Sequence, residues 1–311
     1  MIKRTLYFGN PAYLSIANKQ LVIKLPEVER NDDLPESFKR DSIRKLPIED
    51  IGVVMLDHKQ ITITHGLMEA LLANNTAVIT CDSSRMPLGL MLPLSGNTVQ
   101  SERFRDQLNS SIPLRKQLWQ QTVQAKITNQ AHVLGTLRKT VVKNMQKWAL
   151  DVKSGDSDNL EGRAAVYYWA NLFPSITNFR RDREGVPPNN LLNYGYAILR
   201  AIVARALVGT GLLPTLGIHH HNRYNAYCLA DDIMEPYRPF VDKLVLELFD
   251  SNEDISELST SLKTKLLNIP VMDVMINGQR SPLMIAVSQT TASLAKCFSG
   301  EMRKISYPIF E

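Results

Sequence analysis

The chain has 311 residues, of which 44% are hydrophobic and 22% are charged, with 15 glycines and 16 prolines. This composition is typical of a globular protein with two ordinary domains, and the absence of repeats and low-complexity tracts excludes a solenoid or a disordered chain. The three cysteines, Cys81, Cys228 and Cys297, are far apart and form no CxxC pair. A disulfide framework and a zinc ribbon are therefore excluded, and a reducing compartment such as the cytoplasm fits best.

The hydrophobic runs predict no membrane targeting. The first residues are basic, but Asn10, Pro11 and Asn18 interrupt the apolar run that a signal peptide requires. No apolar stretch approaches the length that is needed to span a bilayer. We therefore expect no membrane partner.

The net charge of +5 is concentrated in one part of the chain. Residues 101–150 carry 9 basic and 2 acidic side chains, whereas residues 1–100 carry 11 of each and residues 151–311 carry 16 and 18. Clustered lysines and arginines release counterions when they bind phosphates, so this segment favours a polyanion as partner. A solvated pair of basic helices would have the same charge, and both interpretations stay open at this point.

Residues 1–95 are predicted to form a small β-rich domain. Five short segments are rich in β-branched and aromatic residues and end at Asn, Pro, Gly or Asp: TLYFGN, AYLSIANKQLVIKL, IGVVMLD, QITIT and AVITCD. The polar stretch 27–45 is predicted to be a mobile loop. Between the last two strands, HGLMEALLANN has apolar residues at helical spacing and ends at Asn74 and Asn75, which suit a C-cap.

Residues 96–311 are predicted to form a larger helical domain. Pro93, Gly96 and Asn97 mark the boundary, and the segments beyond it have apolar residues at three- and four-residue spacing. Helices are expected around residues 101–110, 113–150, 160–171, 190–210, 229–235, 238–250, 253–266 and 281–304. The predicted fold class is α+β, with a small β-rich N-terminal domain followed by a larger all-α C-terminal domain.

The first candidate for chemistry is SDNLEG, residues 157–162. Asp158 and Glu161 are three residues apart at a predicted helix start, which is typical of an N-cap residue and its N3 partner. The structural interpretation of Glu161 is therefore a capping carboxylate. Gly162 leaves space beside Glu161 in which a phosphate could approach, and Arg163 adds positive charge.

The second candidate is the arginine-rich segment 178–207. Its five arginines alternate with Tyr194 and Tyr196, an arrangement that suits phosphate contacts with stacking nearby. Asn189 or Asn190 is expected to cap the helix that follows. Each of these residues taken singly is more typical of a structural role, and Tyr194 in particular lies on a stripe that predicts core.

The third and strongest candidate is LGIHHHNRYNAYCLADDIMEPYRP, residues 216–239. Three consecutive histidines are followed eleven to fifteen positions later by Asp231, Asp232 and Glu235. On a helix, Asp232 and Glu235 share one face, so imidazole and carboxylate groups can converge. This donor set favours Mn²⁺ or Mg²⁺, although zinc also accepts one nitrogen and two oxygens. Histidines that simply pack in the core are the competing interpretation.

Together these motifs resemble the CRISPR adaptation integrase, the first protein of the numbered CRISPR-associated series. The motifs that carry the resemblance are EG at residues 161–162, NYGY at 193–196 with Asn189, GIHH at 217–220 and DIMEPYRP at 232–239. The similarity covers nearly the whole chain, including VITCD and the PLG that follows at residues 87–89. The doubled histidine followed by Asn222, and the compact length, are most similar to the type II branch.

The resemblance implies that a divalent metal, Mn²⁺ or Mg²⁺, is bound by a glutamate, a histidine and a second acidic residue. Carried over to this sequence, the metal ligands and catalytic residues are Glu161, His220 and Glu235. The supporting or competing candidates are Asp232, His219 and His221. The side chains expected to contact DNA phosphates are Lys126, Arg138, Lys139, Lys143, Arg163, Arg180 and Arg181.

The resemblance also implies an activity and partners. A family member inserts spacers into a CRISPR array when the 3′-hydroxyl of the incoming strand attacks a phosphodiester at a repeat end, a transesterification that a metal assists. The implied partners are double-stranded DNA (spacer precursor and CRISPR repeat), a second copy of the chain bound through the β-rich domain, and the small companion adaptation subunit. Two homodimers would flank a dimer of that subunit in a heterohexamer, in the cytoplasm of a prokaryote.

Two other functions compete with integration. A general metal-dependent nuclease that hydrolyses branched DNA would use the same ligands, with water as the nucleophile. A non-catalytic DNA-binding scaffold would use Glu161 only as a cap and pack the histidines.

Overall fold

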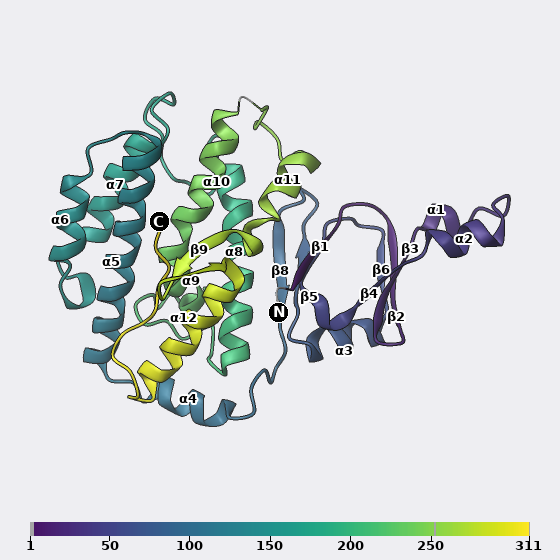
Figure 1. Cartoon of the computed structure of the whole chain (residues 1–311), viewed down its shortest axis with the longest axis horizontal. Helices are drawn as coiled ribbons and strands as arrows, with labels where there is room; N and C mark the ends of the chain where they lie inside the picture. The colour runs from purple at the N-terminus through teal and green to yellow at the C-terminus, as the bar shows by residue number, and fades with distance from the viewer. Residues whose placement is uncertain (1–2, 252, 311) are drawn as a thin grey trace. The chain divides into compact units, whose positions relative to one another are not determined.

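The computed structural model describes residues 3–251 and 253–310, which belong to two compact units, Met1–Gly96 and Asn97–Glu311 (Figure 1). The first unit is rich in strands and the second is mainly helical, which confirms the α+β fold class. All side chains predicted to bind metal or DNA belong to the second unit.

The described residues of the first unit form two four-stranded sheets. The first has the order β1 (Arg4–Phe8), β5 (Ile51–Leu56), β7 (Ala77–Cys81) and β8 (Pro87–Met91). The second has the order β4 (Arg44–Pro47), β3 (Gln20–Lys24), β2 (Ala12–Ala17) and β6 (Ile61–Ile63). In the first sheet β1, β5 and β7 are parallel, and the central β5 is almost entirely buried. Its continuous apolar run, IGVVML, is what a strand covered on both faces requires.

Helix α3 (His65–Ala73) and both sheets enclose a common core. Leu14 of β2, Val54 of β5 and Leu67 of α3 belong to one cluster of buried apolar side chains. The helix ends at Asn74, as predicted, and the carboxamide of Asn74 donates a hydrogen bond to the Ile48 carbonyl (2.7 Å). The helix end is therefore tied to the chain that leads into β5.

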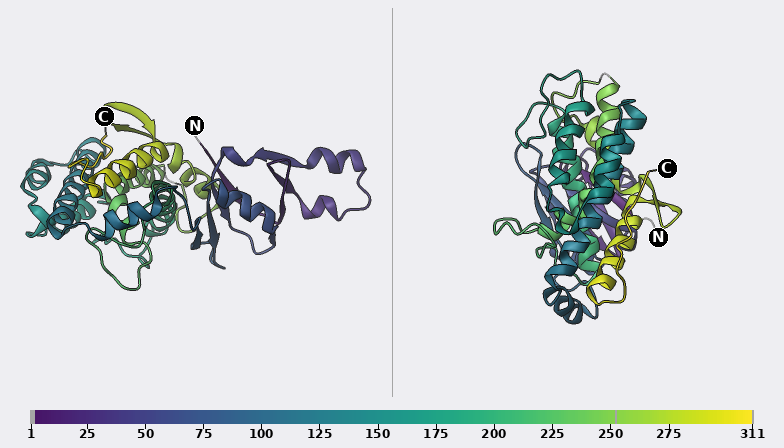
Figure 2. Two further views of the ribbon diagram at one scale, coloured as in Figure 1. Left: turned by 90° about the horizontal axis from the view of Figure 1, so that it is seen from below. Right: turned by 90° about the vertical axis from the view of Figure 1, so that its left-hand side faces the viewer.

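The polar stretch 27–45 was wrongly predicted to be a loop. It contains most of α1 (Pro26–Glu29), all of α2 (Glu36–Ser42) and the start of β4. Neither helix buries a residue, so the sequence has no apolar periodicity that would reveal them. Figure 2 (left) shows both helices, in dark purple, beyond the ends of β3 and β4.

Helices that pack side by side dominate the second unit. Their bounds are α4 (Gln100–Leu108), α5 (Ile112–Leu137), α6 (Lys143–Asp151), α7 (Leu160–Leu172), α8 (Asn189–Thr210), α9 (Cys228–Met234), α10 (Arg238–Asp250), α11 (Thr260–Leu266) and α12 (Leu283–Phe298). Helix α5 packs against α6, α7 and α10, and α8 packs against α9, α10 and α12 (Figures 1 and 2).

Two predicted helices have different bounds. The segment 113–150 forms two helices, because α5 ends at Leu137 and the backbone of Lys139 is left-handed, with φ of 53°. Helix α11 begins at Thr260 instead of residue 253, and the Ser259 side chain caps it by accepting a hydrogen bond from the Leu262 amide.

A hairpin precedes α12 and adds a small sheet to the region that was predicted to be all helical. Strands β9 (Asp273–Ile276) and β10 (Gln279–Pro282) are antiparallel, and the helix predicted around residues 281–304 spans only Leu283–Phe298. The turn residues Asn277 and Gly278 have φ of 52° and 75°. Asn-Gly is the favoured pair for such a turn, so this signal was present in the sequence and was missed.

Helix α8 is the central helix of the second unit, and Tyr194 is fully buried in it, as the core stripe predicted. No side chain caps α8; the Asn189 carboxamide instead donates to the Arg180 carbonyl (3.0 Å), so the predicted cap was wrong. Among the described residues, α8 alone has the length and apolar composition of a membrane span, contrary to expectation. Because 78% of that window is buried inside the unit, α8 has the character of a core helix.

The C-terminal tail fixes α5 against the segment that follows α9. The buried carboxamide of Asn129 on α5 donates to the carbonyls of Pro236 (2.8 Å) and Pro308 (3.0 Å). Two turns away on α5, the hydroxyl groups of Thr122 and Tyr307 lie 2.8 Å apart. Polar contacts therefore set the position of α5, which carries Lys126, relative to the segment that carries Glu235.

Replacing Asn129 with alanine should lower the free energy of unfolding by about 1–3 kcal/mol, because two buried carbonyl groups would lose their donor. Urea denaturation measures the change. The control is Thr128→Ala, at an exposed neighbouring position, which should change stability by less than about 0.5 kcal/mol. Equal stability of Asn129→Ala and the unmodified protein would contradict this account of the tail.

Candidate functional site

The first turn of α7 presents Glu161. Other side chains bind the amide groups of this turn: Asp156 accepts hydrogen bonds from the amides of Leu160 (2.9 Å) and Glu161 (3.0 Å). The N-cap Asn159 accepts a bond from the Gly162 amide (3.2 Å). Capping is thus carried out upstream, and the Glu161 carboxylate contacts α5 instead.

The predicted N-cap, Asp158, does not cap α7. Its carboxylate pairs with Lys153 at 2.8 Å, and both side chains are largely exposed. Asp156 and Asn159, whose backbones are left-handed with φ of 51° and 50°, accept the hydrogen bonds of the first-turn amides instead. The capping interpretation of Glu161 was also wrong, because Asp156 and Asn159 accept hydrogen bonds from the amides of the first turn.

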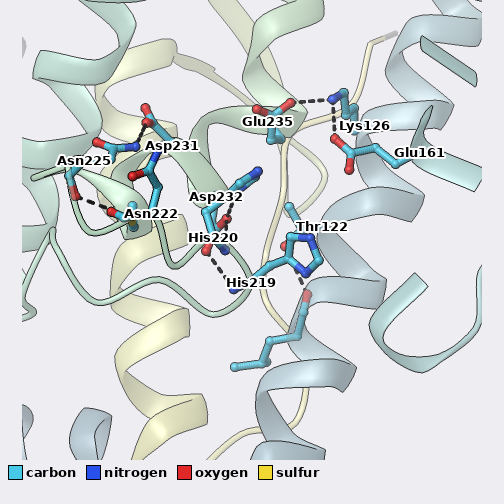
Figure 3. Close-up of polar contacts among 12 residues, drawn as sticks. Thr122, Lys126, Glu161, His219, His220, Asn222, Asn225, Asp231, Asp232 and Glu235 are labelled. Carbon is cyan, nitrogen blue, oxygen red and sulfur yellow. Dashed lines mark hydrogen bonds and ion pairs between the residues drawn. The ribbon is translucent and has the colours of Figure 1, made fainter. Parts of the chain in front are cut away.

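An ammonium group joins Glu161 to Glu235 (Figure 3). Lys126 Nζ lies 2.6 Å from Glu161 Oε1 and 2.5 Å from Glu235 Oε2. The side chains of Lys126 and Glu235 are only 11% and 7% exposed, so their charges interact more strongly than at the surface. Burial alone would lower the pKa of Lys126, but Glu235 and Glu161 outweigh it and raise that pKa. Two carboxylates thus share one cation.

Glu235 begins a short 3₁₀ turn, η3 (Glu235–Tyr237), directly after α9. Its second oxygen, Oε1, accepts a hydrogen bond from Arg238 Nε (2.7 Å). Burial would raise the pKa of Glu235, but the charges of Arg238 and Lys126 outweigh burial and lower that pKa to about 2. Glu235 is therefore ionised at every physiological pH.

A bend at Gly217 brings the histidines onto Asp232. The fully buried carboxylate of Asp232 accepts bonds from the amides of His219 (2.9 Å) and His220 (3.3 Å), and it lies 2.5 Å from His220 Nδ1. A Cβ atom at Gly217 would lie 2.3 Å from the His220 carbonyl oxygen, so this approach requires glycine. The bond to Asp232 raises the pKa of His220 and orients the ring, leaving Nε2 for another partner.

The three histidines have different environments. The His219 ring stacks on Trp119, with 4.2 Å between centroids and 1° between planes, and burial lowers the pKa of His219. His220 packs edge-on against Trp119 and keeps the bond to Asp232. His221 is exposed. These environments support a packing role for His219 and favour His220 as the imidazole ligand.

Within residues 3–251 and 253–310, no group of three or more His, Cys, Asp and Glu side chains is arranged to hold a metal ion. The space between Glu161 and Glu235 is occupied by the ammonium of Lys126. The donors themselves fit a divalent cation, because two carboxylates already share positive charge and His220 has the carboxylate partner typical of metal-binding histidines. Glu161, His220 and Glu235 are the residues that could hold a metal.

Arg238, the partner of Glu235, belongs to a larger network of polar contacts. The guanidinium groups of Arg238 and Arg181 lie 4.4 and 5.1 Å from the centroid of the Tyr196 ring. The hydroxyl of Tyr196 donates to Asp242 Oδ1 (2.5 Å), and that of Tyr168 donates to Oδ2 (3.0 Å). Burial raises the pKa of Asp242 to about 7, and the two tyrosine hydrogen bonds limit the rise.

The predicted phosphate contacts fall into different settings. The side chains exposed to solvent are Lys139, Lys143, Arg163 and Arg180. Arg138 instead donates from Nε to the Leu172 carbonyl (2.7 Å) and from both terminal nitrogens to Asp250 (2.8 and 2.9 Å). Arg181 donates to Asn193 Oδ1 (2.6 Å). These contacts support a structural role for Arg138, whereas the four exposed side chains can bind a polyanion.

Several residues of the site were not found from the sequence. No short motif marks Asp156 or Trp119, because the contacts that give them a role form only in the folded protein. Arg238 had a signal, since it lies three residues after Glu235 at the start of a helix. Lys126 was predicted to contact phosphate, and its pairing with Glu161 and Glu235 has no local signal.

Comparison with known proteins places these motifs in a family. The family described as "CRISPR associated protein Cas1" matches residues 6–268. A curated CRISPR-associated endonuclease Cas1 from Neisseria meningitidis serogroup C (strain 8013) is 34% identical over 294 residues, which cover 94% of this chain and 91% of that protein.

Two solved structures show the same fold. A casposase bound to integration product has a TM-score of 0.76 at 20% identity and covers 98% of this chain and 92% of its own. A Cas6-RT-Cas1–Cas2 complex has a TM-score of 0.73 at 20% identity and covers 97% of this chain but only 36% of the longer matched chain. At these identities the likeness concerns the fold.

Replacing Asp242 with asparagine should weaken the pH dependence of stability. Asp242 has a pKa of about 7 in the folded protein and an ordinary value of 3.8. Between these pH values the folded protein keeps a proton that the unfolded chain has lost. Raising the pH therefore lowers the free energy of unfolding, by at most about 1.4 kcal/mol per pH unit from this group.

Urea denaturation between pH 4.5 and 8 measures this contribution as the difference in slope between the unmodified protein and Asp242→Asn. Asp273→Asn, at an exposed position, is the control and should keep the original slope. Equal slopes for Asp242→Asn and the unmodified protein would show that Asp242 does not hold the proton.

Proposed function

Because the chain belongs to the Cas1 family of CRISPR-associated proteins, we propose that it is a metal-dependent DNA integrase and endonuclease of CRISPR adaptation. In the proposed reaction, the 3′-hydroxyl of a spacer precursor attacks a phosphodiester at the end of a CRISPR repeat. One phosphodiester bond forms as another breaks, and the displaced strand leaves with a 3′-hydroxyl. The reaction needs no covalent protein nucleophile.

The observation that carries this proposal is the convergence of Glu161 and Glu235 on one cation. The two residues are 74 positions apart, and the sequence motifs around them predict that both bind metal. A scaffold protein would gain nothing from placing the partly buried Glu161 beside the buried Glu235, since their repulsion must be offset by Lys126 and Arg238. A catalytic cation site explains why they are there.

Each residue of the site has a role in the proposed reaction. A bound Mn²⁺ or Mg²⁺ ion would polarise a phosphoryl oxygen and stabilise the oxygens that gain charge. Glu161 and Glu235 would supply anionic ligands, and Arg238 keeps Glu235 ionised. Asp232 orients His220 so that its Nε2 is available.

The basic side chains would hold the DNA. The exposed side chains, Lys139 and Lys143 within residues 101–150 and Arg163 and Arg180 after them, are free to contact phosphates of the spacer precursor and the repeat. Arg163 also lies over the ring of Trp148, with 5.9 Å to the ring centroid, which limits its motion.

We propose the assembly that the sequence resemblance implies. Two copies of the chain would form a homodimer through the β-rich unit, and two homodimers would bind a dimer of the small companion subunit, because a spacer has two ends to join. One structure with this fold is a complex that contains Cas2, and another is a casposase bound to integration product, which supports a companion subunit and DNA as partners. The proposed location is the cytoplasm of a prokaryote, without a membrane partner.

Single replacements Glu161→Gln, Glu235→Gln and His220→Ala should each reduce strand transfer by about a hundredfold or more, because each removes a group that stabilises charge in the transition state. The assay uses labelled spacer and target DNA with Mn²⁺ and counts joined strands. Glu247→Gln, which makes the same change at an exposed position of α10, should keep full activity.

The products of the same assay separate the alternatives. An integrase yields strands longer than the labelled spacer, whereas a hydrolytic nuclease yields only shorter ones. Strand transfer that continues in all three variants, or that is insensitive to chelation of the metal, would contradict the proposed site.

Replacing Lys143 or Lys139 with alanine should weaken DNA binding uniformly across sequences. Each lost phosphate contact should reduce the slope of log affinity against log salt concentration by about 1, because fewer counterions are released. Fluorescence anisotropy at several salt concentrations gives the slope. Lys45→Ala, an exposed lysine of β4 in the other unit, is the control; an unchanged slope in both Lys143→Ala and Lys139→Ala would remove these residues from the DNA interface.

A further inference from the structure

We propose that Lys126 is the resident counter-cation of the catalytic carboxylates and that a divalent metal must displace its ammonium group to bind. The inference rests on the proposed metal site of Glu161, His220 and Glu235 and goes beyond it, because it assigns Lys126 to control of metal binding instead of DNA contact. Lys126 would hold the site closed to metal until its side chain moves.

The first argument is position. Lys126 Nζ is within 2.6 Å of one oxygen of Glu161 and one of Glu235, which are the two anionic groups proposed to bind the metal. A divalent ion bound by those same oxygens would need the volume that the ammonium occupies. It would also repel the ammonium strongly, since like charges at such distances in a poorly solvated site are costly. Lysine and metal are therefore mutually exclusive.

The second argument is charge. Without Lys126, Glu161 and Glu235 would lose the cation that they share, and Glu235 would keep Arg238, which is bound to its other oxygen. Leaving a partly buried carboxylate without its partner is strongly destabilising. Lys126 therefore stabilises the metal-free protein, and the same pairing makes the carboxylates less available to a metal.

The third argument is space for the displaced side chain. Lys126 and Glu235 line a cavity that also reaches Arg181, Arg183 and Trp169. The stem of Lys126 is anchored on the buried face of α5, so only the ammonium end needs to turn. Because the arginines make this cavity attractive to a phosphate, the ammonium would find an anion there when DNA is bound.

The test is a calorimetric titration of Mn²⁺ into the full chain without DNA. If Lys126 occupies the carboxylates in nine of ten molecules or more, removing it should lower the apparent Kd for Mn²⁺ by about tenfold or more. Lys126→Met and Lys126→Gln both remove the charge and should bind Mn²⁺ more tightly. Lys126→Arg keeps the charge and should bind no more tightly than the unmodified protein, as should Lys147→Met, at an exposed position of α6.

A second readout covers the case in which a neutral variant folds poorly. In EDTA the thermal midpoint of Lys126→Gln should fall by more than about 5 °C, and Mn²⁺ should raise it by more than it raises the midpoint of the unmodified protein. A midpoint in EDTA that is unchanged in Lys126→Gln would contradict the role of Lys126 as counter-cation.

The outcomes separate this inference from the proposed function. If the unmodified protein binds Mn²⁺ through Glu161, as shown by loss of binding in Glu161→Gln, and the neutral Lys126 variants bind no more tightly, only the role of Lys126 is wrong. If neither the unmodified protein nor the neutral variants bind Mn²⁺, the metal site is wrong and this inference falls with it.

Discussion

The structure of the site depends on one electrostatic constraint: two carboxylates from distant parts of the chain are held beside each other with little water. Glu161 and Glu235 repel each other, and burial increases the cost of that repulsion. Lys126 offsets it with an ion pair to each glutamate (2.6 and 2.5 Å), and Arg238 adds a third ion pair, to Glu235 (2.7 Å). An arrangement of this kind persists only if the surrounding helices fix all four side chains.

The fold fixes them through contacts made by polar groups away from the site. Asp156 and Asn159 complete the first turn of α7 and free Glu161 from a capping role. Asn129 ties α5 to Pro236, next to Glu235, and to the C-terminal tail. Asp232 collects two backbone amides and one imidazole at the bend that starts at Gly217. The first two sets of hydrogen bonds position the elements that carry Glu161, Lys126 and Glu235, and the third positions His220.

Sequence reasoning predicted the class of fold and much of the helical pattern because apolar periodicity is a local property. It failed where the local signal was absent or misread. Helices α1 and α2 bury no residue and have no apolar stripe, and the Asn277–Gly278 turn that ends β9 was passed over. The cap of α7 was assigned to Asp158 because Glu161 follows it by three residues, whereas Asn159 is the N-cap and Asp158 pairs with Lys153.

The site shows the same division between local and non-local information. Glu161, His220, Asp232 and Glu235 were found because short motifs surround them, and the structure brings Glu161 close to Glu235 and His220 close to Asp232. The pairing of Lys126 with both glutamates joins segments 35 and 109 residues apart, and nothing in the residues around it indicates that pairing. Whether Glu161, His220 and Glu235 hold one metal together stays a prediction.

The central claim is that Glu161 and Glu235 form a cation site that Lys126 occupies when no metal is bound. A crystal structure of the protein soaked with Mn²⁺, with anomalous scattering to locate the ion, tests it most directly. The account predicts manganese bound by Glu161, Glu235 and His220, with the Lys126 ammonium moved away from both carboxylates. Manganese bound elsewhere while Lys126 still bridges Glu161 and Glu235 would contradict it.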